Sequence, residues 1–219
     1  MAIKVKDLIY KIRYKAKDFN EILYSDFDII EAVNECIRYL NQEKALRNSD
    51  FLEKTQHYVE SEMNAEIAEQ NEDLPDEEKL PLYDFAKDGV ELPEDMITIV
   101  DIMRLKDAYH LHPIPAVEEI NPHDCGQYKI VNGKIYANAD FVLLYRAEIA
   151  QITLNDLSDS DAIVELPSVF TDLLVKVSVM ILTNTADTDV MAQEVSRVAN
   201  NLITGRRYNN IKVRMPFKV

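Results

Sequence analysis

The sequence predicts an α+β protein, mainly a helical bundle formed by N- and C-terminal helices, with a small β-rich insertion and an extended C-terminal tail. Apolar residues recur at helical spacing near the N-terminus and again after residue 167, whereas β-branched runs lie between about residues 90 and 150. The 219 residues include 47% hydrophobic residues and only four glycines, which favours a packed core. The predicted division is residues 1–89 and 151–207 for the bundle, 90–150 for the insertion and 208–219 for a docking tail.

The N-terminal part of the chain predicts three helices. A short helix is expected over residues 3–15. Ser25 and Asp28 match a capping box, so a longer helix is expected over residues 26–47. A third helix is expected over residues 50–69, antiparallel to the second. The apolar residues that support the third helix are Leu52, Val59, Met63 and Ile67.

The middle of the chain predicts strands. Residues 96–103 (MITIVDIM) are dense in β-branched side chains, which predicts a buried strand. Asn132 and Gly133 stand between two short strand-like runs, the pattern of a hairpin with a type I′ turn. Residues 141–145 (FVLLY) are expected to continue that sheet.

Two further helices are expected after the insertion. Residues 169–182 are apolar on nearly all sides, so this helix should be the most buried, and Pro167 suits its start. The last helix is expected over residues 187–203, with Gly205 as its stop.

The C-terminal tail has strict alternation of apolar and polar residues from Ile211 to Val219, which predicts a strand. Such a strand either forms an edge of its own sheet or adds to a neighbouring protein, and we favour the second interpretation. The residues expected to bind a partner are Arg206, Arg207, Tyr208, Ile211, Val213, Arg214, Met215, Phe217 and Val219.

Charge is unevenly distributed. The net charge is -15, with +5 in residues 1–17 and +5 in residues 206–219, so the rest of the chain carries -25. Most of the surface should therefore repel nucleic acid, and only the two ends could hold phosphate. Near those ends, Tyr10 and Tyr14 flank Arg13, an arrangement that suits either base stacking or protein contact, and the acidic body favours protein contact. Residues 69–81, acidic and with two prolines, predict an exposed loop.

Motifs of catalysis and cofactor binding are absent from the sequence. It contains no GxGxxG, GxxxxGK[ST], GxSxG or HExxH pattern. Four side chains are the best candidates for a zinc site, but they do not have a known zinc spacing: His110, His112, His123 and Cys125. Two aspartate groups are better interpreted as a solvated loop and a helix cap than as cation sites: Asp156, Asp159 and Asp161, and then Asp187 and Asp189. We therefore expect no catalytic residue, no cofactor and no metal, and a protein that is not an enzyme.

The sequence contains neither a membrane helix nor a secretory signal, which bears on where the protein is located. No apolar run reaches the roughly 18 residues of a membrane helix, and residues 1–15 do not match a secretory signal. Cys36 and Cys125 stand in unrelated contexts, which favours a reducing compartment. We expect no membrane contact.

Three stretches in order suggest a family: residues 25–41 (SDFDIIEAVNECIRYLN), 90–105 (VELPEDMITIVDIMRL) and 164–182 (VELPSVFTDLLVKVSVMIL). The chain resembles the head-to-tail adaptor (connector) proteins of tailed bacteriophages, including the tail tubular protein A group, over most of residues 20–205. The resemblance implies a ring, commonly of twelve copies, that lies below the portal protein, extends the DNA channel and carries the next tail or nozzle protein. It also implies a place in the virion at the head-tail junction, with assembly in the bacterial cytoplasm. Genomic DNA would pass through without sequence-specific binding, and the C-terminal segment would grip the portal.

Two alternatives stay open. The chain could be an assembly chaperone or regulatory protein that docks through its C-terminal strand. A metal-dependent hydrolase or nuclease using the acidic clusters is the other, and the absent motifs and the acidic body count against it.

Overall fold

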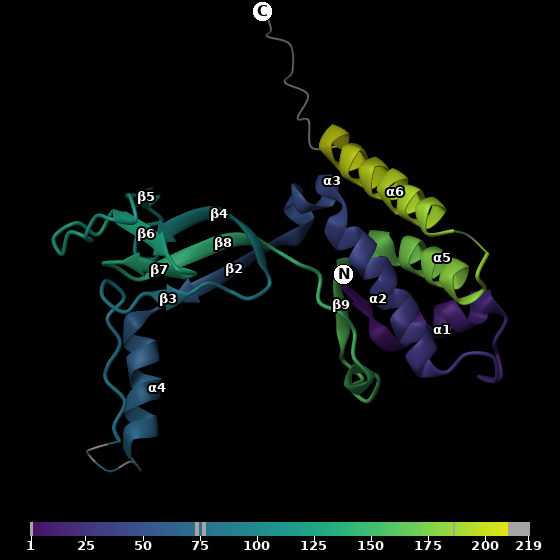
Figure 1. Cartoon of the computed structure of the whole chain (residues 1–219), viewed down its shortest axis with the longest axis horizontal. Coiled ribbons are helices and arrows are strands. Elements are labelled where there is room, and N and C mark those ends of the chain that lie inside the picture. The colour runs from purple at the N-terminus through teal and green to yellow at the C-terminus, as the bar shows by residue number, and fades with distance from the viewer. Residues whose placement is uncertain (1, 73–74, 76–77, 186, 210–219) are drawn as a thin grey trace, which may run out of the picture. The chain divides into compact units, whose positions relative to one another are not determined.

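The computed structural model describes residues 2–72, 75, 78–185 and 187–209 and confirms the α+β class (Figure 1). It contains two compact units, Met1–Leu52 with Glu148–Val219, and Glu53–Ala147. The chain therefore divides near residues 52 and 147, not at the predicted 89 and 150. Residues 53–89 belong to the second unit because residues 53–58 form one of its strands.

Helices of both chain ends meet in the first unit, where α5 packs against α1 and α2. Its strands β1 and β9 pair antiparallel. The elements of this unit are β1 (Ala2–Lys4), α1 (Val5–Ala16), α2 (Asp26–Gln42), α3 (Lys44–Arg47), the 3-10 turns η1 (Asp50–Leu52), η2 (Leu154–Leu157) and η3 (Ser168–Phe170), β9 (Ile163–Pro167), α5 (Thr171–Leu182) and α6 (Thr188–Asn209).

Helix α2 starts with the predicted capping box. The Asp28 N–H donates to Ser25 Oγ at 3.2 Å, and the Ser25 N–H donates to Asp28 Oδ2 at 2.9 Å. The predicted end at residue 47 is wrong, because Glu43 adopts an extended conformation (φ -70°, ψ 110°) and the short α3 follows as a separate turn.

The two C-terminal helices differ from their predictions at their ends. The first part of α5 is buried as predicted, with Leu174 and Val177 fully inaccessible, whereas its last turn is only half-buried. Helix α6 continues through Gly205 to Asn209, so the predicted stop is wrong. A glycine inside a helix costs only about 1 kcal/mol, which the rest of a long helix outweighs.

Glu194 ties α6 to α5. It accepts hydrogen bonds from Arg197 of its own helix and from Lys176 of α5, the latter at 2.7 Å. These bonds, first Arg197 and then Lys176, lower the pKa of Glu194 to about 2.

Two asparagines of α2 hold the chain where it returns to the first unit. The buried Asn34 side chain donates to the Ile152 carbonyl at 2.9 Å and accepts the Ile152 N–H at 2.8 Å. Asn41 forms the same pair of bonds with Ile149, at 3.0 and 2.9 Å. Each amide thus satisfies a backbone N–H and C=O as a neighbouring strand would. We call each such pair an asparagine clamp.

The second unit contains two sheets. One has the order β2-β8-β4, all antiparallel, and the other has the order β3-β7-β6-β5. The elements are β2 (Glu53–Tyr58), α4 (Glu60–Glu72), β3 (Val90–Glu91), β4 (Met96–Arg104), β5 (His112–Pro113), β6 (Gln127–Val131), β7 (Lys134–Ala137) and β8 (Phe141–Ala147). The central strand β8 alternates buried and half-buried residues, and its inward side chains Phe141, Leu143 and Tyr145 form the core.

Three predictions for this region are wrong. Residues 53–58 form strand β2 rather than the first turns of a helix, because β8 pairs with all six of them. Strand β4 is mostly half-exposed, with only Ile102 buried, since it lies at an edge of its sheet. Strand β8 joins β2 and β4, not the hairpin of residues 127–137.

The hairpin itself is confirmed. Strands β6 and β7 pair with Val131 opposite Lys134. Asn132 and Gly133 both have positive φ, 51° and 78°, which is the conformation of a type I′ turn.

Helix α4 carries a second set of asparagine clamps. Asn64 donates to the Tyr83 carbonyl at 3.0 Å and accepts the Tyr83 N–H at 2.6 Å. Asn71 does the same with Leu80, at 2.8 and 2.7 Å. In both units the asparagines are seven residues apart and their partners three apart. Seven helical residues advance about 10.5 Å and three extended residues about 10 Å, so an extended chain stays in register along the helix.

Replacing a clamp in the core should destabilise the first unit. Asn34→Ala leaves the buried N–H and C=O of Ile152 without partners, so we expect the free energy of unfolding to fall by about 3 kcal/mol. Chemical denaturation measures it. The matched control is Asn200→Ala at an exposed position of α6, with an expected change within about 0.5 kcal/mol. Equal losses in both variants would contradict a structural role for the clamp.

Candidate protein-docking surface

Helix α1 buries one face and exposes aromatic side chains on the other. Leu8 and Ile12 are fully inaccessible, whereas Tyr10 is 72% and Tyr14 57% exposed. The tyrosines are four residues apart and so lie on the same face. They also line a groove towards α5 together with Lys11, Lys15, Asp172 and Val175. An exposed pair of aromatic rings beside a groove is typical of a contact surface.

Arg13 points the other way, into the protein. Its guanidinium is buried and pairs with Asp18 at 2.7 Å and with Asp26 at 2.6 Å. It also donates to the Tyr24 carbonyl at 3.0 Å. The predicted role of Arg13 in contacting a partner beside the tyrosines is therefore wrong, because a buried arginine that is fully paired cannot reach outward.

Asp18 organises the loop between α1 and α2. Helix α1 ends at Ala16, and the left-handed conformation of the next residue, Lys17 (φ 60°), turns the chain. One Asp18 oxygen accepts the N–H groups of Ile22 and Leu23, both at 2.9 Å, and the other accepts that of Tyr24 at 3.2 Å. These bonds, the one from Leu23 foremost, lower the pKa of Asp18 against the opposing effect of burial, and Arg13 lowers it further. A single carboxylate thus fixes the loop.

The fixed loop presents apolar side chains outward. Phe19 is 66%, Ile22 79% and Leu23 65% exposed. The Phe19 ring meets the Tyr14 ring edge to face, with centroids 5.5 Å apart, which joins the loop to the α1 face. We call the five residues Tyr10, Tyr14, Phe19, Ile22 and Leu23 the docking surface. Its shape is set before any partner arrives, which lowers the entropic cost of binding.

Basic residues accompany the docking surface. Lys11, Lys15 and Lys17 are exposed on α1 or at its end, and Lys176 lines the adjoining groove with Val179 and Met180. The surface is therefore apolar with a basic margin, in a protein whose net charge is -15.

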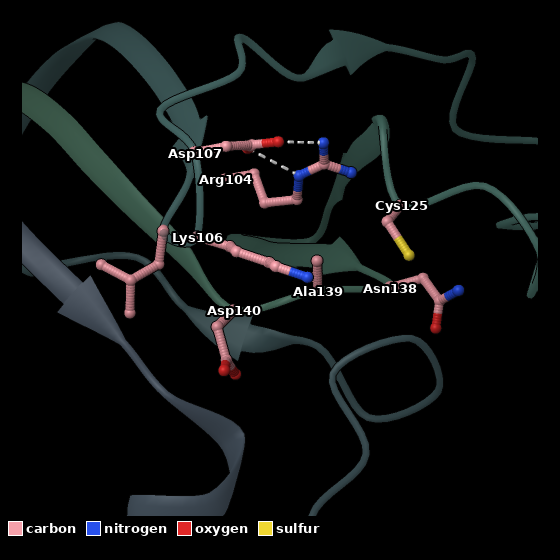
Figure 2. Close-up of a pocket in the computed structure, with 8 residues that line it drawn as sticks. Arg104, Lys106, Asp107, Cys125, Asn138, Ala139 and Asp140 are labelled. Atoms are coloured by element: carbon pink, nitrogen blue, oxygen red, sulfur yellow. Dashed lines mark hydrogen bonds and ion pairs between the residues drawn. The ribbon is translucent and has the colours of Figure 1, made fainter.

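A pocket in the second unit shows structural rather than catalytic pairing (Figure 2). Arg104 donates to both oxygens of Asp107, at 2.9 and 2.5 Å. Asp140 accepts the N–H of Glu60 at 2.8 Å and so holds the start of α4. Cys125 also lines the pocket, and the described lining contains no histidine to take its proton. Nothing in this lining forms a nucleophile with its base.

The histidines proposed as metal ligands contact different partners. His110 pairs with Asp101 at 2.6 Å and His112 with the Tyr109 hydroxyl at 3.0 Å. Across the part of the chain that the structure describes, no three His, Cys, Asp or Glu side chains gather as a metal site would require.

The two aspartate groups take local structural roles. Asp156 accepts the Thr153 N–H at 2.6 Å, Asp159 accepts the Asp161 N–H at 2.8 Å, and Asp161 pairs with Lys4 at 3.1 Å. The Asp187 carbonyl accepts the N–H groups of Val190 and Met191, so Asp187 takes the position just before α6.

Neither cysteine forms a disulfide bond. Both Cys36 and Cys125 are free thiols, and burial raises the pKa of Cys36 to about 12, which makes it unreactive. Among the described residues, no helix has the length and apolarity needed to cross a bilayer.

The predicted C-terminal binding residues fall into two groups. Arg206, Arg207 and Tyr208 lie on α6, so the predicted start of the extended tail at residue 208 is wrong. The other six lie outside the described residues: Ile211, Val213, Arg214, Met215, Phe217 and Val219.

Sequence reasoning missed the loop residues of the docking surface. Phe19, Ile22 and Leu23 have no helical or strand period, so no pattern marks them as a face. Their signal was three large apolar residues in a short segment between two amphipathic helices, where polar residues are the rule.

Comparison with known protein families and curated proteins identifies no relative of the chain. No model of a known protein family matches the chain, and no curated protein matches it significantly. Function must therefore be inferred from the residues themselves.

The pKa of Asp18 gives a pH prediction. Because that pKa is lowered by folding, its contribution to stability is present above pH about 4 and is lost as the pH falls below it. Amide NMR shifts of Ile22 and Leu23 should titrate together in that acidic range. Asp18→Asn should abolish this titration and lower the melting temperature, whereas Asp172→Asn at an exposed site should do neither. A shared midpoint above pH 5 would contradict the network.

Proposed function

We propose that this chain is a structural virion protein, a head-to-tail adaptor that forms a ring below the portal of a tailed bacteriophage. It extends the DNA channel and offers a platform to the next tail or nozzle protein. The observation that carries the proposal is the docking surface, an apolar and aromatic face fixed by a buried ion-pair network in the first unit. A face that is built rigidly and left exposed suits permanent assembly with other proteins.

The helices of the first unit and the sheets of the second support the family resemblance. Helices from both chain ends pack together around α5, and the chain between them forms a β-rich insertion, as the resemblance implies. All three resembling stretches contain ordered elements: α2 in the first, β4 in the second and α5 in the third.

The charge distribution suits a channel wall. Outside the two basic ends the chain carries -25, so DNA passing through the ring would be repelled rather than held. Sequence-specific DNA binding is not part of the proposal, nor is any enzymatic step, cofactor or metal. The virion at the head-tail junction is the proposed location, with assembly in the host cytoplasm.

Assembly with the portal tests the function. The purified chain, mixed with the portal protein of the same virus, should form a ring visible by electron microscopy, with about twelve copies by native mass spectrometry. A chain that stays monomeric with and without portal would overturn the proposal. If it binds portal transiently and is absent from mature virions, the assembly-chaperone alternative would be correct.

The docking surface should be needed for assembly but not for folding. Ile22→Ser with Leu23→Ser removes two exposed anchors, so the unfolding free energy should change by less than about 0.5 kcal/mol. Assembly should weaken by roughly tenfold or more, because each buried anchor contributes about 1 kcal/mol or more. Chemical denaturation measures the unfolding free energy, and light scattering measures assembly. The control is Val117→Ser, 94% exposed on the second unit, which should assemble normally.

The C-terminal tail should be needed for portal binding. Because α6 runs to Asn209, a deletion of residues 210–219 spares the helix and removes the alternating segment. We expect portal affinity to be lost while circular dichroism is unchanged. Serine at Val213, Met215 and Phe217 should reproduce the loss, whereas serine at Lys212 and Lys218 should not. Undiminished portal binding by the deletion variant would contradict this role.

A further inference from the structure

Helix α4 lacks the cover that a helix of its length normally needs. It has 13 residues, and none of its side chains is buried. Isolated helices of this length are marginally stable in water. Glu62, Glu66 and Glu69 follow each other at spacings of four and three residues, so their charges repel along the helix. Apart from Met63, which packs against the core of the unit, the helix therefore depends on hydrogen bonds to stay in place.

The helix is fixed at its base and along its side. The Glu60 N–H donates to Asp140 at 2.8 Å, and the Glu60 carboxylate accepts the Phe85 N–H at 2.9 Å. The two asparagine clamps bind residues 80–83 along the helix. We call α4 with residues 78–83 the arm. Figure 1 shows α4 extending away from the strands of its unit.

The arm is both acidic and apolar. Residues 60–72 contain five glutamates and no basic residue. On the returning chain, Leu80 is 48% and Leu82 64% exposed, and Ile67 of the helix is half-exposed, whereas Met63 packs against the core of the unit. A fixed arm that leaves these side chains in water is built to bury them against something else.

The docking surface has the complementary character. Its exposed rings and aliphatic side chains would cover the leucines of the arm, and Lys11, Lys15 and Lys17 at its margin match the glutamates in charge. Basic residues would also relieve the repulsion along α4.

We propose that the arm of one copy binds the docking surface of a second copy. The inference rests on the proposed function, since it names the contact that would build the ring. Arm and docking surface are different parts of the chain, so the contact is heterologous and each copy offers one of each. Repeated contacts of this kind close into a ring when the rotation between copies is a whole fraction of a turn.

Charge reversal on each side tests the contact. The arm variant carries Glu62→Lys, Glu66→Lys and Glu69→Lys, and the surface variant carries Lys11→Glu and Lys15→Glu. All five positions are exposed, so both variants should fold. Each alone should fail to form rings, because like charges then face each other. The matched control, Glu118→Lys with Glu119→Lys at exposed positions elsewhere in the second unit, should assemble as the wild type does.

Mixing the two variants gives the decisive result. Each variant restores opposite charges for the other, so an equimolar mixture should form rings in which the two alternate. Native mass spectrometry with one variant isotope-labelled counts both. A contact within a single copy would give no rescue on mixing, and that outcome would overturn the inference.

Cross-linking locates the contact. A zero-length carboxylate-to-amine reagent on mixed labelled and unlabelled wild type should join Lys11 or Lys15 to the arm glutamates of the differently labelled copy. Links confined to one copy would overturn the inference. Rings that survive both reversals would overturn it and leave the adaptor function standing, whereas a wild type that never forms rings, with or without portal, would overturn both.

Discussion

The asparagine clamp is the interaction on which the path of the chain depends in both units. Segments 149–152 and 80–83 belong to no strand, yet their backbone groups are satisfied by side-chain amides of α2 and α4. The device works because seven helical residues and three extended residues cover nearly the same distance. Without it, the first segment would leave buried polar groups unpaired, and the second would lose the hydrogen bonds that join it to a helix with no buried side chain.

The Arg13–Asp18 network has an equivalent role for the exposed surface. Burying a charged pair stabilises a fold little, and its main effect here is to specify one loop conformation. The Asp18 carboxylate accepts hydrogen bonds from three backbone N–H groups at once. A different loop conformation would break these bonds and leave the buried Arg13 without its partner. The network holds Phe19, Ile22 and Leu23 in exposed positions that the hydrophobic effect alone would not favour.

Local patterns located most elements, and tertiary pairing explains the failures. The capping box of Ser25 and the turn at Asn132-Gly133 depend on adjacent residues alone, so both were predictable. Residues 53–58 became a strand because β8, nearly ninety residues later, offered an edge to pair with. The sequence predicts a contact face that contains Tyr10, Arg13 and Tyr14. The prediction is wrong for Arg13, because spacing in sequence does not reveal that the buried carboxylate of Asp18 pairs with it.

The sequence by itself determined the α+β class, the start of α2, the type I′ hairpin, the buried first part of α5 and the uneven charge. Each of these follows from residue identity at short range, through propensity, capping or period. Only the tertiary structure decided where the two units divide, which strands share a sheet, that Asn34, Asn41, Asn64 and Asn71 act as clamps, and that the loop after α1 carries an apolar face. These features join residues far apart in the chain or depend on a buried partner, and the free energy of such contacts appears only once the chain has folded around them.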